Sequence, residues 1–285
     1  MAGSRLDHHS PKYADGIGNF GLSYHLELIK DAERVSAITA ALDECLNEDS
    51  VHCELGVGTG IFAIYAAKRC RKVYAVERDP AIFRIAQENI DRSGMGSKIE
   101  LILADASTFI PPEKSDTLLV EMMSVWCINE PQIPVLNHAI KHILKQNGRA
   151  IPGRIVNTFE LGYYHFDALG VNCKASIPEF SGITKPRIMT TSYVFNEFDF
   201  RQNNPERFEH TVPVTSLLSG TINCARLSSL VQLSEGVTFF STDSLMPQTI
   251  IPLQNELEVR AGEPLHFSAA FDVRTNLDDS NFWLE

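Results

Sequence analysis

Cysteine is scarce in this sequence, and no two cysteines have the spacing of a metal site. Six cysteines are scattered through 285 residues, and none belongs to a Cys-x-x-Cys pair. This distribution excludes a disulfide framework and a cysteine zinc site, and unpaired thiols are typical of the cytoplasm. We therefore expect a cytoplasmic protein with no metal at its functional site.

Positive charge is also in short supply. The 25 lysines and arginines are outnumbered by 36 aspartates and glutamates, which gives a formal net charge of −11. Surfaces that bind nucleic acids need clustered lysine and arginine to contact the phosphates, so we expect no nucleic-acid partner. An acidic protein can still attract a cationic partner or substrate.

Long apolar runs are missing as well. No run of apolar residues approaches the roughly 18 positions that a membrane-spanning helix needs. Residues 1–16 also lack the apolar core of a signal peptide. We therefore expect no membrane partner.

The first half of the chain alternates between helix-like and strand-like segments. Residues 22–45 carry apolar side chains at helical spacing, and helical stretches separate short apolar strands at 51–55, 73–76 and 99–103. Strands separated by helices of this length predict βαβ units and a parallel sheet. We predict a Rossmann-like α/β domain with an N-terminal helix over residues 1–149.

The residue composition of the chain changes after the pair Pro152-Gly153. Segments such as 236–240 and 265–273 are rich in β-branched and aromatic residues, and helical periodicity is hard to find there. This composition predicts a mainly antiparallel, barrel-like β domain. We place it at residues 150–285, where it would complete the substrate pocket.

The strongest local motif is Val51-His-Cys-Glu-Leu-Gly-Val-Gly-Thr-Gly60. Glycines at 56, 58 and 60 follow a buried strand and allow the backbone to turn tightly and to approach a ligand closely. Dinucleotide enzymes use Gly-x-Gly-x-x-Gly, whereas Gly-x-Gly-x-Gly preceded by an acid, here Glu54, is the variant that binds S-adenosylmethionine (SAM). No Lys-Ser/Thr follows Gly60, which excludes a phosphate-binding P-loop. The motif predicts SAM as the cofactor, bound by Glu54, Gly56, Gly58 and Gly60.

Two acids follow at the ends of the next two predicted strands. Glu77 lies about 20 residues after the glycine motif, where a carboxylate binds ribose hydroxyls in nucleotide-binding folds. Asp105 and the adjacent Ala106 would lie near the adenine. The alternatives are a solvated glutamate at a strand end and an aspartate that caps a helix.

These motifs resemble those of the protein arginine methyltransferase family. The resemblance covers most of the chain, and its most specific part is Val120-Glu-Met-Met-Ser-Val-Trp-Cys-Ile-Asn-Glu130. The family has a loop after its fourth strand that carries two glutamates nine positions apart, and Glu121 and Glu130 have this spacing. The resemblance implies a class I methyltransferase domain, SAM as methyl donor and these two glutamates as catalytic residues.

The chemistry of a guanidino group supports the same assignment. A guanidinium is planar and presents paired N–H donors, which carboxylates accept bidentately. Two carboxylates at the carboxyl end of the sheet would aim one nitrogen at the sulfonium methyl and stabilise the charge that passes to nitrogen. The alternative is that Glu121 and Glu130 are two acids in a surface loop.

The resemblance also implies roles for residues outside this pair. Arg34, in the segment that matches the N-terminal helix of the family, would hold the carboxylate of SAM. The residues that we assign to the substrate pocket are Tyr13, His25, Met123, Trp126 and Asn129.

The chain departs from the family in three places. Ile17 stands where a second tyrosine is usual, and Ser244-Leu245-Met246 aligns with a Thr-His-Trp loop. The segment after Tyr163-Tyr164 is too short for the usual helical dimerisation arm, which leaves a homodimer open. We therefore expect the methyl acceptor to be a guanidino or amino group of a small molecule in secondary metabolism, with S-adenosylhomocysteine as the product.

Two alternatives remain. One is a SAM-consuming cyclase, in which the α-amine of SAM attacks its own γ-carbon to give azetidine-2-carboxylate and methylthioadenosine. The apolar side chains of Met122, Met123 and Trp126 and the altered loop at 244–246 would favour that closed pocket. The other is a non-catalytic SAM-binding regulatory protein, although binding alone does not require both glutamates.

Overall fold

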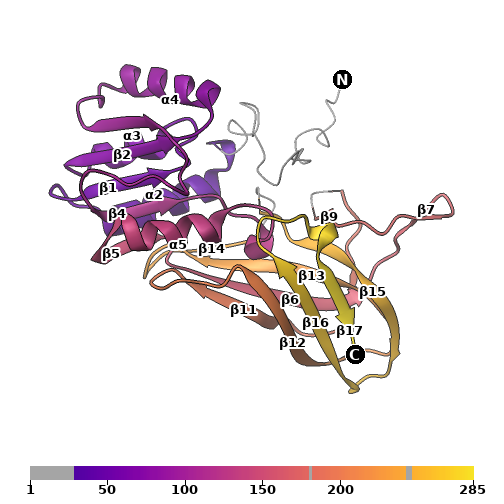
Figure 1. Cartoon of the computed structure of the whole chain (residues 1–285). Coiled ribbons are helices and arrows are strands. Elements are labelled where there is room, and N and C mark those ends of the chain that lie inside the picture. The colour runs from indigo at the N-terminus through magenta and orange to yellow at the C-terminus, as the bar shows by residue number, and fades with distance from the viewer. Residues whose placement is uncertain (1–28, 180–181, 242–245) are drawn as a thin grey trace.

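The computed structural model describes residues 29–179, 182–241 and 246–285 (Figure 1). The predicted pocket residues Tyr13 and His25 lie outside these ranges, as do Ser244 and Leu245 of the altered loop. No helix within the three ranges is both long and apolar enough to span a membrane.

The first half of the described chain forms a five-stranded sheet in the order β3-β2-β1-β4-β5, and every pair of neighbours is parallel. Its strands are β1 (Val51–Leu55), β2 (Lys72–Glu77), β3 (Ile99–Leu103), β4 (Ser115–Val120) and β5 (Leu144–Ile151). The helices are α2 (Ala32–Cys45), α3 (Ile61–Ala67), α4 (Pro80–Ser93) and α5 (Gln132–His142). All five residues of β1 are buried, as expected for a parallel strand that is covered on both faces. The strand order reverses between β1 and β4, and ligands of such sheets bind beyond the carboxyl ends of the strands at this point.

Local signals explain where the helices begin and end. The Asp79 side chain accepts hydrogen bonds from the first backbone N–H groups of α4, and Pro80 occupies the first helical position. Gly94 ends the same helix in the left-handed conformation. These caps hold α4 directly after Glu77, at the end of β2.

The second half of the described chain is built from antiparallel strands. A seven-stranded sheet has the path β10-β6-β13-β15-β9, with β11 on β6 and β14 on β13, and a three-stranded sheet has the order β12-β16-β17. Its long strands are β6 (Arg154–Tyr163), β11 (Tyr193–Asp199), β12 (Arg207–Thr215), β13 (Gly220–Gln232), β15 (Thr249–Val259), β16 (Pro264–Asp272) and β17 (Asn281–Leu284). The short ones are β7 (Asp167–Ala168), β8 (Val171–Asn172), β9 (Ile177–Pro178), β10 (Arg187–Ile188) and β14 (Thr238–Phe240). Two 3₁₀ turns complete the fold, η2 (Val125–Cys127) and η3 (Leu277–Asp279).

This architecture confirms the predicted fold class, a Rossmann-like parallel sheet followed by mainly antiparallel sheets. Beyond residue 200 the only helical segment in the described ranges is η3. The predicted boundary at 149–150 falls inside β5, which pairs with β4 at the edge of the parallel sheet.

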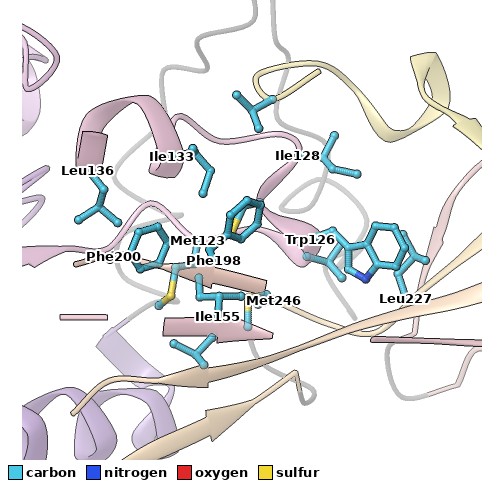
Figure 2. Close-up of a cluster of buried hydrophobic side chains, with 14 of the residues drawn as sticks. Met123, Trp126, Ile128, Ile133, Leu136, Ile155, Phe198, Phe200, Leu227 and Met246 are labelled. Atoms are coloured by element: carbon cyan, nitrogen blue, oxygen red, sulfur yellow. The ribbon is translucent and has the colours of Figure 1, made fainter. Parts of the chain in front are cut away.

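The two halves share one hydrophobic core. Met123, from the loop after β4, packs with Ile133 and Leu136 of α5 and with Phe198 and Phe200 at the end of β11 (Figure 2). The loop between β4 and α5 is therefore held from both sides, by the parallel sheet and by the antiparallel strands.

Candidate active site

The glycine motif forms a tight loop between β1 and α3. Gly56, Gly58 and Gly60 have φ angles of +77°, +56° and +85°, in the left-handed region that favours glycine. A Cβ added at Gly56 would lie 2.6 Å from Cε of Met122, so the loop also packs closely against the segment that carries Glu121. The left-handed glycines agree with the predicted tight turn, and the close approach of this loop to a ligand stays a prediction.

Glu77 fastens this loop to the end of β2. Its carboxylate accepts hydrogen bonds from the N–H groups of Gly58 at 3.0 Å and of Arg78 and Asp79 at 2.9 Å. A carboxylate offers about four acceptor positions, so these three bonds leave room for one ribose hydroxyl. Glu77 is buried beside the glycine loop, unlike a solvated glutamate at a strand end.

Glu54 brings a buried carboxylate to the same edge of the sheet. Burial and the negative charge of Glu77 raise its pKa well above the ordinary value, and the charge of Arg34 opposes this. Its Oε2 atom is buried and has no hydrogen-bond partner among the residues that the structure describes. A cationic or hydrogen-bonding ligand would satisfy this atom, so the residues present fit a bound SAM.

Asp105 lies just after β3 and caps a turn. Its Oδ1 atom accepts from the backbone N–H of Ser107 at 2.8 Å and from the Ser107 hydroxyl at 2.6 Å. The hydroxyl bond is the main cause that lowers the pKa of Asp105. The capping alternative therefore describes part of what Asp105 does, and its contact with adenine, like that of the buried Ala106, stays a prediction.

Arg34 and Glu121 form an ion pair at the carboxyl end of the sheet. Arg34 lies in the first turn of α2, where the Asp31 side chain accepts a hydrogen bond from its backbone N–H at 3.0 Å. The Arg34 guanidinium is 5% exposed and binds the carboxylate of Glu121, the residue that follows β4. Elements 87 residues apart in the sequence thus place a cation against the first of the two predicted catalytic glutamates.

Glu130 supplies the second carboxylate. Burial raises its pKa to about 8, and the nearby charge of Arg34 acts in the opposite direction. Within the described ranges no hydrogen bond reaches its carboxylate, although the side chain is buried. Glu54, Glu121 and Glu130 therefore lie near one guanidinium, and because a bound cation favours the ionised form of a carboxyl, these groups suit a cationic ligand.

The loop that carries both glutamates has an unusual backbone. Trp126 and Cys127 have φ angles of +59° and +56°, which cost free energy for residues other than glycine. Ser229 Oγ accepts a hydrogen bond from the Trp126 N–H at 3.0 Å, and Asn157 Nδ2 donates to the Trp126 carbonyl at 3.3 Å. Ser124 Oγ accepts from the N–H of Asn129 at 3.1 Å, which closes the loop from within.

Two residues that we predicted in the substrate pocket lie elsewhere. Trp126 is fully buried, stacks on Phe195 with ring centres 4.5 Å apart, and donates from Nε1 to the Thr158 carbonyl at 2.9 Å (Figure 2). Met123 is buried in the shared core. Both side chains therefore anchor the loop in the core, while Asn129 is half-buried.

Sequence reasoning missed the polar residues that hold the loop. Ser229 and Asn157 come from distant strands, and nothing in their local pattern relates them to a site. Gln132 lies two residues after the two-glutamate motif, but a glutamine at a helix start carries no functional signal in sequence. Cys127, inside the motif, is buried and its thiol has a raised pKa, so it is not an activated nucleophile.

Four features define the class of protein. They are the parallel sheet, the glycine loop held by Glu77, the Glu54 oxygen without a partner among the described residues, and the two glutamates around Arg34. The protein is a class I SAM-dependent methyltransferase, an enzyme with SAM as its cofactor.

The comparisons with known proteins lead to the family. The methyltransferase domain family matches residues 53–148. An uncharacterised protein of Methanocaldococcus jannaschii is 30% identical over 236 residues, which are 82% of this chain and 87% of that protein. An arginine N(omega)-methyltransferase of Streptomyces achromogenes subsp. streptozoticus is 25% identical over 268 residues, covering 85% of this chain and 74% of that one.

The solved Trypanosoma brucei PRMT1 enzyme–prozyme heterotetrameric complex with AdoHcy has the same fold. It superposes with a TM-score of 0.78 at 17% identity, covering 93% of this chain and 98% of that chain. The chain belongs to the arginine methyltransferase-like family of class I SAM-dependent methyltransferases.

Proposed function

We propose that this enzyme transfers the methyl group of SAM to a guanidino or amino nitrogen of a small cationic molecule. The observation that carries the proposal is the group of buried carboxylates around Arg34. Glu121 already binds a guanidinium, that of Arg34, and the buried Glu130 carboxyl accepts no hydrogen bond from the described residues. A second guanidinium or an ammonium ion would complete this arrangement.

Different residues of the chain have different roles in the proposed methyl transfer. SAM, when bound, supplies a methyl carbon on a positively charged sulfur. Glu121 and Glu130 orient the acceptor so that the lone pair of one nitrogen forms the N–C bond, while the electrons of the C–S bond stay on sulfur. The bound cation favours the ionised form of Glu130, and the proton that leaves the methylated nitrogen passes to this carboxylate.

Arg34 and Glu77 bind SAM in this proposal. Arg34 holds the carboxylate of SAM, and its pairing with Glu121 links the position of SAM to that of the acceptor. Glu77 accepts a ribose hydroxyl with the acceptor position that its three backbone hydrogen bonds leave.

Two observations support a small acceptor, and we propose that the reaction belongs to secondary metabolism. The Streptomyces relative, whose name specifies arginine as its substrate, is similar across 85% of this chain. The sequence also lacks the Thr-His-Trp loop of the protein-modifying family at residues 244–246. We propose a cytoplasmic location for the same enzyme.

SAM cyclisation would be favoured by an apolar pocket of Met122, Met123 and Trp126, and two of these three side chains lie elsewhere. Met123 and Trp126 pack in the shared core instead of facing the cofactor edge of the sheet. Methyl transfer therefore has the stronger support.

The test is incubation with SAM, alone and with L-arginine, agmatine or an arginine-containing peptide, followed by mass analysis. We expect S-adenosylhomocysteine and a methylated product with a small cation, and little product with the peptide. Methylthioadenosine formed without an acceptor would contradict the proposal, as would preference for the peptide.

A further inference from the structure

Gln132 holds the backbone on both sides of Glu121. It is the first residue of α5 and its side chain is fully buried. Its Oε1 atom accepts a hydrogen bond from the Met122 N–H at 2.7 Å, and its Nε2 atom donates to the Val120 carbonyl at 2.8 Å. The two bonds straddle Glu121 and fix both peptide groups that flank it.

The two hydrogen bonds of Gln132 take the place of pairing with a neighbouring strand. At Val120 the chain leaves β4, so the next backbone groups have no pairing from β1 or β5. A buried N–H or C=O group without a partner is costly, and one side chain satisfies both groups here only because an amide carries a donor and an acceptor.

The same contact sets the separation of the two glutamates. Gln132 follows Glu130 by two residues. Its hydrogen bonds to the backbone of Val120 and Met122, on either side of Glu121, therefore hold the two ends of the segment 121–132 together, and we call this closed segment a ring. Within this segment, Ser124 Oγ accepts a hydrogen bond from the backbone N–H of Glu130 at 3.4 Å. Fixing the backbone at Glu121 fixes the direction in which its side chain leaves toward Arg34.

We propose that Gln132 is a positioning residue, which aims the Glu121 carboxylate at the acceptor and at Arg34. The part of this proposal that concerns the acceptor rests on the proposed function. The contact itself is independent of that function and can be measured without an acceptor.

The first test is Gln132→Glu followed across pH. A protonated carboxyl can donate to the Val120 carbonyl and accept from the Met122 N–H as the amide does, whereas a carboxylate cannot donate. Burial raises the pKa of a carboxyl at this site. With L-arginine as the probe acceptor, kcat of the variant divided by kcat of the unaltered enzyme should fall at least about tenfold from pH 6 to pH 9, in line with lost alignment.

The second test is Gln132→Met, which keeps the volume and removes both hydrogen bonds. We expect kcat to fall about 100-fold, the scale of a misplacement near 1 Å, with SAM affinity changed by less than about threefold. Hydrogen exchange at the Met122 amide, measured without SAM or acceptor, should be at least about tenfold faster than in the unaltered chain.

The matched control is Asn204→Asp. Asn204 is also a buried amide that grips backbone, accepting from the Asp199 N–H at 3.2 Å and donating to the Asp199 carbonyl at 3.0 Å. Its hydrogen bonds within the described ranges reach Asp199, Gln202 and Asn137 of α5 but not the glutamate loop. This variant should therefore lose thermal stability, while its kcat divided by that of the unaltered enzyme should not change with pH.

The outcomes separate the two proposals. If hydrogen exchange at the Met122 amide is as slow in Gln132→Met as in the unaltered chain, the positioning role is overturned. It is also overturned if the kcat of Gln132→Glu, relative to that of the unaltered enzyme, does not change with pH. If the unaltered chain does not methylate L-arginine, the proposed acceptor fails and the exchange rates still decide the role of Gln132. If Gln132→Met does not fold, the pH series of Gln132→Glu decides it.

Discussion

Glu130 is an acid whose charge depends on what occupies the site. In the ligand-free chain burial raises its pKa from 4.5 to about 8, so at pH 6 most of the carboxyl is protonated. A cation that binds beside it favours the ionised form and releases the proton. The same shift makes ligand-free stability fall as pH rises from about 4.5 to about 8, because the unfolded glutamate ionises first.

We expect the KM for L-arginine to fall with rising pH. From pH 6 to pH 8 KM should fall about fiftyfold, because the ionised fraction of Glu130 grows from about 1% to about one half, and above pH 8 the curve should level off. Steady-state kinetics across this range measures it. Glu130→Gln should have a nearly flat curve, and an equally flat curve in the unaltered enzyme would refute this role of Glu130.

At this scale the sequence predicted the chemistry better than the orientation of side chains. Glu54 and Glu77 were predictable from the glycine motif and the strand ends, and Arg34 and Glu121 from the family resemblance; the structure brings the four together. Trp126 was placed in the pocket because sequence does not reveal that its backbone adopts a positive φ.

The element that matters most is the loop between β4 and α5. It carries both glutamates, and its strained turn is held by the antiparallel strand β13 through Ser229 (Figure 1). Ser229 Oγ also donates to Asn157 Oδ1 at 2.8 Å, so one hydroxyl joins the loop to two strands. The antiparallel half therefore supports the geometry of a site whose predicted catalytic residues all lie in the parallel half.

Ser229→Ala tests this support. The change leaves the buried Trp126 N–H and Asn157 Oδ1 without a partner, so the free energy of unfolding should fall by about 1–3 kcal/mol. Turnover should fall as well, because the loop loosens.

Ser268→Ala is the matched control. Ser268 is equally buried on β16, but its hydroxyl bonds to Thr211, an exposed residue that can turn to water. Urea titration should show a smaller loss of stability than for Ser229→Ala, with unchanged turnover. Equal losses of turnover in the two variants would contradict the assigned role of Ser229.

Over the whole molecule, the alternation of helical and strand-like segments predicted the parallel sheet and the composition predicted the antiparallel sheets, but the strand β5 between the two halves was missed. β5 has the sequence Leu-Lys-Gln-Asn-Gly-Arg-Ala-Ile, in which the Asn147-Gly148 pair indicates a turn. The segment is nevertheless a strand at the sheet edge, where polar residues are tolerated and one neighbour supplies the pairing. The continuous core across both halves could not be predicted, because it depends on tertiary contacts such as that of Met123 with Phe198.

The most direct test of the account is turnover of Glu121→Gln and Glu130→Gln with SAM and L-arginine. Each change removes a charge and keeps the shape, so acceptor-dependent formation of S-adenosylhomocysteine should fall at least about 100-fold, as when one preorganised electrostatic group is lost. Affinity for SAM should change little, and Glu113→Gln, at a half-buried glutamate that pairs with Arg71 outside this cluster, should remain fully active. Near-normal turnover in both variants would contradict the claim that these two glutamates hold a cationic acceptor for methyl transfer.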